Sequence, residues 1–127
     1  MSTWTPEQLR SFASADDLHI APFRENGTTY GTPTFIWSVV AHGDLYVRPY
    51  NGRRSRWYQA ALSQGSGRVS IAGTDYEVDF VPAGTAALPG VDDAYRQKYG
   101  TSPYLAPMIA PGPRSTTLRV TPRSADR

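Results

Sequence analysis

The stretch FIWSVVAHGDLYVR, residues 35–48, carries the clearest structural signal in the chain. β-branched and aromatic side chains fill both of its halves, and these residue types favour strands. His42-Gly43-Asp44 separates the halves and is typical of a tight turn. The pattern predicts a hairpin, with a first strand over residues 29–41 and a second over residues 45–48. Pro33, near the start of the first strand, indicates a sheet edge or a bulge there.

Two more hairpins are expected on either side of this one. Asn26-Gly27 follows a short strand candidate at residues 18–21, and Asn-Gly favours the positive φ angles of a two-residue hairpin turn. Further along, Gly73-Thr74 separates two strand candidates, and apolar and acidic residues alternate in the second of them. These two strands and a final one are expected over residues 68–72, 75–81 and 115–121.

Three helices are expected between the strands. Thr5-Pro6-Glu7-Gln8 combines an N-cap residue, a proline at the first helical position and a capping-box glutamine. This helix should end near residues 14–17. The other two helices are expected over residues 53–64, ended by glycines, and over residues 91–99, ended by Gly100. Residues 82–90 and the proline-rich residues 102–113 are expected to be surface loops.

Length and composition set the class of protein. The 127 residues fit one domain, with the tail 122–127 expected to be disordered, and a core of this size needs no disulfide or metal. The absence of cysteine fits a cytoplasmic protein, and no apolar run is long enough for a membrane span or a signal peptide. Short strands with few helices predict a small α+β fold, whose antiparallel hairpins close into a barrel.

Charge is unevenly distributed, although the net charge is only +2. Residues 45–74 contain five arginines and no acid, whereas residues 75–93 contain five acids and no base. Three of these arginines lie in the turn that precedes the central helix, where a helix N-terminus also attracts anions. The turn therefore predicts a phosphate-bearing small-molecule ligand. Two alternatives stay open: a solvated turn paired with Asp75, Glu77 or Asp79, and a nucleic-acid surface, which the low net charge disfavours.

Candidate catalytic groups are sparse. His42 in its turn and Tyr95 on the third helix are the weak candidates for acid–base chemistry, and a structural role is the simpler interpretation of both. Two isolated histidines and no cysteine predict no metal site. Among the aromatic residues, Phe35 is expected in the core, whereas Tyr30 and Trp37 are left open between core and a stacking wall.

The order of these motifs resembles the flavin-binding split-barrel superfamily, which includes pyridoxamine-phosphate-oxidase-like and deazaflavin-dependent nitroreductase-like proteins. The chain is more closely similar to a bacterial family known only as a domain of unknown function. The residues that carry this resemblance are Trp4-Thr5, Leu45 to Arg48, Trp57-Tyr58 and the stretch from Tyr95 to Tyr99.

The resemblance implies a split barrel, often a homodimer, with a flavin-type cofactor against the barrel. It implies that FMN or a deazaflavin coenzyme binds through its phosphate to Arg48, Arg53, Arg54, Ser55 and Arg56. The ring would lie against Tyr30, Thr32, Thr34 and Trp37. The expected function is a flavin- or deazaflavin-dependent oxidoreductase acting on a small organic molecule, without metal, nucleic acid or membrane. The alternatives are a cofactor-free barrel (an isomerase or cyclase, or a non-catalytic binding module) and a partner-binding dimer.

Overall fold

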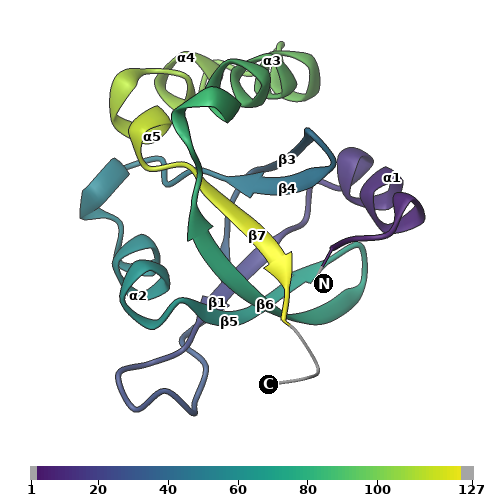
Figure 1. The fold of residues 1–127 in the computed structure, drawn as a ribbon. Coiled ribbons are helices and arrows are strands. Elements are labelled where there is room, and N and C mark those ends of the chain that lie inside the picture. The colour runs from purple at the N-terminus through teal and green to yellow at the C-terminus, as the bar shows by residue number, and fades with distance from the viewer. Residues whose placement is uncertain (1–2, 124–127) are drawn as a thin grey trace.

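The computed structural model describes residues 3–123, and it is built on one antiparallel sheet of seven strands (Figure 1). The strand order is β2-β1-β5-β6-β7-β4-β3. The strands are β1 His19–Pro22, β2 Thr34–Phe35, β3 Ser38–Ala41, β4 Asp44–Val47, β5 Ser66–Ile71, β6 Thr74–Pro82 and β7 Leu118–Pro122. The helices are α1 Pro6–Ser14, α2 Arg56–Gln64, α3 Leu88–Tyr99, α4 Leu105–Met108 and α5 Pro111–Ser115, with short 3₁₀ helices at Gly52–Arg54 and Thr85–Ala87. The α+β class is confirmed.

The sheet curls into a half-barrel, and its two edge strands follow each other in the chain. β2 pairs with β1 at one edge, and β3 pairs with β4 at the other. The chain therefore crosses between the edges at Ile36 and Trp37, where the amide of Ile36 donates to the carbonyl of Leu18 at 3.0 Å. The expectation of one continuous strand over residues 29–41 is wrong, because the two halves of that segment pair with different strands.

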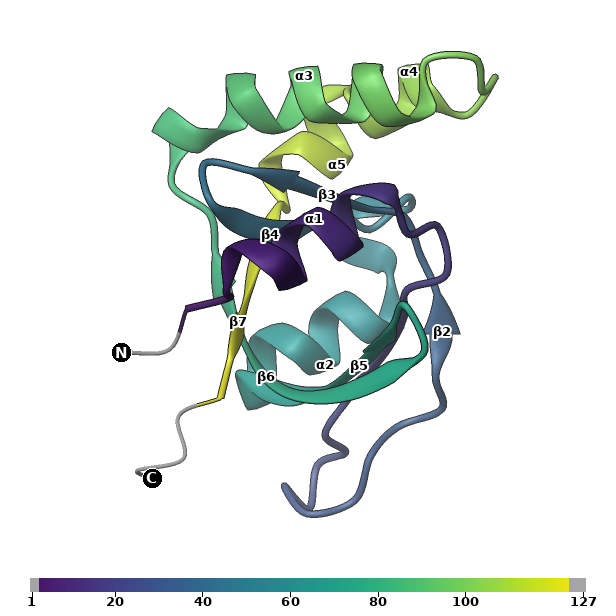
Figure 2. The same ribbon diagram turned by 90° about the vertical axis from the view of Figure 1, so that its right-hand side faces the viewer.

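The concave side of the sheet holds the main core. In β4, Leu45 and Val47 point inward, and the core also receives Phe12 from α1 and Ala61 from α2. Trp4 anchors the chain before α1, since its indole N–H donates to the carbonyl of Val120 at 2.8 Å. Figure 2 shows α1 and α2 against the curled sheet, and α3 as a further layer above β3 and β4.

A second core lies between the outer face of β3–β4 and α3. It contains Val39, Tyr46, Val91, Tyr95 and Met108. Met108 belongs to α4, so the expectation of a surface loop over residues 102–113 is wrong. Prolines at helix starts do not prevent short helices, and α5 begins with one. α3 also begins earlier than expected, at Leu88, because the 3₁₀ helix Thr85–Ala87 leads directly into it.

Local turn chemistry follows the sequence closely. Thr5 and Gln8 form the expected capping box. His42 and Gly43 adopt φ angles of 52° and 74°, as a tight hairpin turn requires. The Asn26-Gly27 hairpin is wider than expected, because the side chain of Asn26 accepts from the amides of Thr28 and Thr29 and holds a longer loop.

Two further expectations concern the chain end and membranes. Pro122 closes β7 and so belongs to the sheet, and residues 124–127 of the expected disordered tail lie outside the described residues. Within residues 3–123, every helix is too short or too polar to traverse a lipid bilayer.

Candidate functional site

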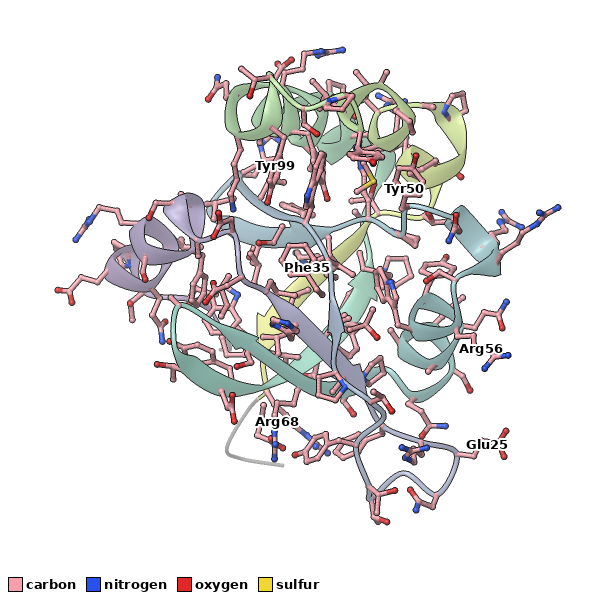
Figure 3. The ribbon with its side chains drawn as sticks, turned by 180° about the vertical axis from the view of Figure 1, so that it is seen from behind. Glu25, Phe35, Tyr50, Arg56, Arg68 and Tyr99 are labelled. Atoms are coloured by element: carbon pink, nitrogen blue, oxygen red, sulfur yellow. The ribbon has the colours of Figure 1, made fainter. Side chains whose placement is uncertain are left out.

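A cavity of about 650 Å³ opens between the β2–β3 crossing, the segment after β4, and α4. Figure 3 looks onto this face, with Phe35 near its centre and Tyr50 and Arg56 to one side. The lining combines aromatic side chains with arginines. It consists of Thr34, Phe35, Ile36, Trp37, Arg48, Tyr50, Asn51, Arg54, Ser55, Arg56, Trp57, Tyr104 and Met108.

One end of the cavity is the start of α2. Ser55 is the N-cap residue, with extended backbone, and its hydroxyl makes no capping hydrogen bond. The first amides of a helix have no partner within the helix, so they present donors and a partial positive charge here. Arg54 and Arg56 flank Ser55 and line the cavity. The arrangement can bind a phosphate or a similar anion.

Arg53 lies outside the cavity lining, although it neighbours Arg54 in the chain. It belongs to the 3₁₀ helix Gly52–Arg54, and its carbonyl accepts from the side-chain amide of Gln59 at 2.8 Å. The side chain of Arg53 is therefore not among those that surround the cavity, which separates it from the other two arginines of the turn.

Aromatic side chains form the walls and the mouth. Trp37 and Trp57 line the cavity, and Phe35, Tyr50 and Tyr104 are 53%, 48% and 60% exposed around it. The rings of Tyr50 and Tyr104 meet edge to face at 6.1 Å. The expectation that Phe35 belongs to the core is wrong, because both residues of the edge strand β2 are exposed. Flat faces at the wall suit an aromatic ligand.

Arg48 lies at the floor of the cavity and is completely buried. Its Nη2 is 2.7 Å from a carboxylate oxygen of Asp92, its Nε donates to the hydroxyl of Thr117 at 2.8 Å, and its Nη1 donates to the carbonyl of Met108 at 3.0 Å. Nε and Nη1 of Arg48 thus have hydrogen-bond partners within the protein, whereas Nη2 has an ion-pair contact with Asp92 and makes no hydrogen bond. The guanidinium of Arg48 is thus held by protein groups at the floor of the cavity, and its expected contact with a cofactor phosphate stays a prediction.

Sequence reasoning missed Asp92. The residue is buried on α3, together with Leu88, Val91 and Tyr95. These positions follow the spacing of one buried helix face, and an acid within such a face signals a buried partner of opposite charge. The helical pattern of residues 88–95 could therefore have identified it.

Tyr30 and Thr32 lie away from the cavity, whereas Thr34 lines it. The hydroxyl of Tyr30 donates to the carboxylate of Glu77 at 2.5 Å, and burial and this carboxylate raise the pKa of Tyr30. The guanidinium of Arg68 lies 3.9 Å above the ring of Tyr30 and within 4.0 Å of both Asp75 and Glu77. Arg68, which lies outside the turn before α2, thus pairs with the acids of β6.

His42 and Tyr95 occupy structural positions. The His42 ring lies against Gly90, and its Nε2 is 3.3 Å from the carbonyl of Ala87, so it holds the β3–β4 turn against the start of α3. Tyr95 is fully buried behind the cavity floor, with its ring 5.1 Å from the guanidinium carbon of Arg48, and burial raises the pKa of its hydroxyl. Neither side chain lines the cavity.

The ionisable groups at the cavity restrict its chemistry. Among residues 3–123, those that line it include arginines and tyrosines but no Asp, Glu, His or Lys. The same part of the chain contains no group of three or more His, Cys, Asp or Glu side chains placed to hold a metal. The lining can bind and orient a ligand, and its tyrosine hydroxyls can donate hydrogen bonds.

Comparison with known proteins identifies one family. The model of a family described as "Uncharacterized protein conserved in bacteria (DUF2255)" matches residues 8–120. No curated protein and no solved structure matches the chain. The curled antiparallel sheet is compatible with a split barrel. Because the family match spans most of the sequence, this chain belongs to the DUF2255 family of uncharacterized bacterial proteins.

Proposed function

We propose that this protein binds a flavin- or deazaflavin-type cofactor in the cavity and acts as an oxidoreductase on a small organic molecule. One observation carries the proposal: aromatic walls and an anion-binding helix start meet in a single cavity without an acidic lining residue. A planar ring that carries a phosphate combines the two matching chemical features. A neutral or cationic ligand would leave the arginines at the rim without a partner.

The residues present fit such a cofactor. The volume of about 650 Å³ lies within the range of small-molecule and cofactor sites, which runs from roughly 300 to 1,000 Å³. Arg54, Arg56 and the free hydroxyl of Ser55 would hold the phosphate, because guanidinium groups offer paired donors to phosphate oxygens. Trp37 and Trp57 would contact the ring. Arg48 contributes to the floor rather than to the phosphate contact.

In this proposal the cofactor and the protein contribute different parts of the chemistry. A bound flavin or deazaflavin would supply hydride chemistry, which no side chain of the cavity provides. The chain's own residues bind and orient: the arginines fix the phosphate end, and the aromatic walls exclude water from the ring end. Tyr50 and Tyr104 at the mouth can donate hydrogen bonds to a substrate that enters over the ring.

A second candidate is a cofactor-free module that binds another phosphate-bearing aromatic metabolite. The same cavity supports it. The catalytic version, an isomerase or cyclase with His42 as base, receives less support, because His42 packs against Gly90 and is not a lining residue. Replacement of His42 by alanine should leave ligand binding unchanged in either case.

Cofactor fluorescence tests the proposal directly. Purified protein is titrated with FMN and with a deazaflavin coenzyme, and we expect saturable binding of at least one. Arg56→Gln should weaken binding of that cofactor about tenfold, the loss of one charge-assisted contact. Arg53→Gln is the matched control, because it removes the same charge from a neighbouring residue outside the lining. A protein that binds neither cofactor contradicts the proposal, and so does an equal loss in the two variants.

A further inference from the structure

Asp92 joins three segments behind the cavity. One of its carboxylate oxygens is 2.7 Å from Nη2 of Arg48, at the end of β4, and the other accepts from Nε of Arg114, on α5, at 2.8 Å. The Asp92 side chain is 11% exposed and that of Arg48 is completely buried. A single carboxylate therefore lies between the buried guanidinium of Arg48 and that of Arg114, whose side chain is 36% exposed.

This network reaches the wall of the cavity through Arg48. Nη1 of Arg48 donates to the carbonyl of Met108, the last residue of α4. Nε of Arg48 donates to the hydroxyl of Thr117, which in turn donates to the carbonyl of Arg114 at 2.7 Å. Both α4 and α5 are thus tied to Arg48 and Asp92 by side chains.

The wall depends on these ties because its helices are short. α4 has four residues and α5 has five, and isolated helices of that length do not persist in water. Tyr104, the residue before α4, and Met108, at its end, both line the cavity. The position of one side of the cavity is therefore set by contacts that lie outside it.

We infer that Asp92 is a positioning residue for the cavity: it holds α4 in place through Arg48 and Arg114 and thereby sets how tightly a ring is bound. The identity of the ligand in this inference rests on the proposed function. The role of Asp92 in holding α4 in place does not. Without the carboxylate, the buried guanidinium of Arg48 would lose its counter-charge, and such a loss is strongly disruptive.

The test compares Asp92→Asn with Asp93→Asn in the ligand-free protein and with flavins. Asp93 is the adjacent acid on α3, and it is exposed and paired with Arg96, so it controls for the charge change. Amide hydrogen exchange of residues 104–115 should become about tenfold faster in Asp92→Asn and stay unchanged in Asp93→Asn. Affinity for riboflavin, which has the ring but no phosphate, should fall by a similar factor.

Substitutions of the phosphate-binding residues should change ligand affinity in a different pattern from Asp92→Asn. Arg56→Gln should weaken FMN binding and leave riboflavin binding intact, whereas Asp92→Asn should weaken both by the same factor. A general loss of stability is recognised because it speeds exchange throughout the β5–β6 hairpin as well. If Asp92 positions α4, faster hydrogen exchange in Asp92→Asn should be confined to residues 104–115 and should accompany a lower affinity for riboflavin.

Each outcome decides one of the two claims. If the unaltered protein binds no flavin, the proposed function fails, and the exchange comparison still tests the role of Asp92. If Asp92→Asn exchanges and binds riboflavin like the unaltered protein, the inference is overturned and the proposed function stands. If Asp92→Asn does not fold, Arg114→Gln decides, because it keeps the pair between Arg48 and Asp92. Unchanged exchange of residues 104–115 in Arg114→Gln would then overturn the inference.

Discussion

The indole of Trp37 lies flat on the phenol ring of Tyr99, with centroids 3.9 Å apart and planes 2° from parallel. The Tyr99 hydroxyl accepts from the amide of Ser38 at 3.3 Å and is 3.2 Å from its carbonyl, so the backbone of β3 fixes the ring. Trp37 also lines the cavity. The last turn of α3 therefore supports a cavity wall from behind.

This stack gives a paired prediction for Tyr99. Tyr99→Phe keeps the stacked ring and removes the hydroxyl contacts, so it should cost about 1 kcal/mol of unfolding free energy and leave the cavity intact. Tyr99→Leu also removes the ring contact, worth about 0.5–1.5 kcal/mol, and should release Trp37. Tryptophan fluorescence and riboflavin titration compare the two variants. Equal riboflavin affinity in both would show that the stack does not shape the cavity.

Gly67 should not tolerate a side chain. It pairs with Pro22 between β5 and β1, and a β-carbon there would lie 2.6 Å from both the carbonyl oxygen of Ala21 and the α-carbon of Pro22. Gly67→Ala should lower the free energy of unfolding by about 1–3 kcal/mol, because main-chain atoms of the sheet must shift. Gly84→Ala is the control, since nothing lies within 4 Å of a β-carbon there. Urea unfolding that gives the same midpoint for both variants would contradict the tight packing.

The environment of Lys98 should make the free energy of unfolding increase with pH. It is the only lysine of the sequence, and its ammonium donates to the carbonyls of Phe12 and Ser38. Burial lowers its pKa from 10.5 to about 8, although the nearby Asp16 and Asp17 oppose this shift. The folded chain thus releases this proton at lower pH than the unfolded chain. The unfolding free energy should therefore increase as the pH rises from about 8 towards 10.

Lys98→Met isolates this contribution, because it lacks the titrating amine. As the pH rises from about 8 towards 10, the unfolding free energy of the natural protein should increase relative to that of the variant. The slope of this free-energy difference against pH should stay well below about 1.4 kcal/mol per pH unit, the limit for one titrating group, because Lys98 is partly solvated. Above pH 10 the buried Tyr95 and the partly buried Tyr99, whose pKa values burial raises, act in the opposite direction. Parallel pH profiles below that point would contradict the assignment.

The sequence predicts the parts of the fold that depend on neighbouring residues. The hairpins predicted at His42-Gly43-Asp44 and around Gly73-Thr74 both form, the second with its turn at Ala72-Gly73, one residue earlier than expected. The start of α1 follows from its capping box. The break at Ile36 and Trp37 could not be predicted in this way. It arises because β2 and β3 pair with different strands, and such pairing is decided by the whole sheet.

The same division holds for the candidate site. The charge pattern and the expected helix start indicate Arg54 and Arg56, the family resemblance implies Ser55, and all three line the cavity. The position of Arg48 was not predicted, since its partner Asp92 is distant in the sequence and meets it only when α3 packs on β4. The short helices α4 and α5 were not predicted, because their segment is rich in proline, which is typical of loops. Tertiary contacts stabilise both helices.

A comparison of FMN with riboflavin shows whether the cavity binds a ring and a phosphate together. The two ligands share the ring and differ by the phosphate. We predict that FMN binds at least about tenfold more tightly at low salt, and that added salt or Arg54→Gln with Arg56→Gln removes this advantage without abolishing riboflavin binding. Equal affinity for the two ligands, or no binding of either, would show that the cavity is not a site for a phosphate-bearing ring.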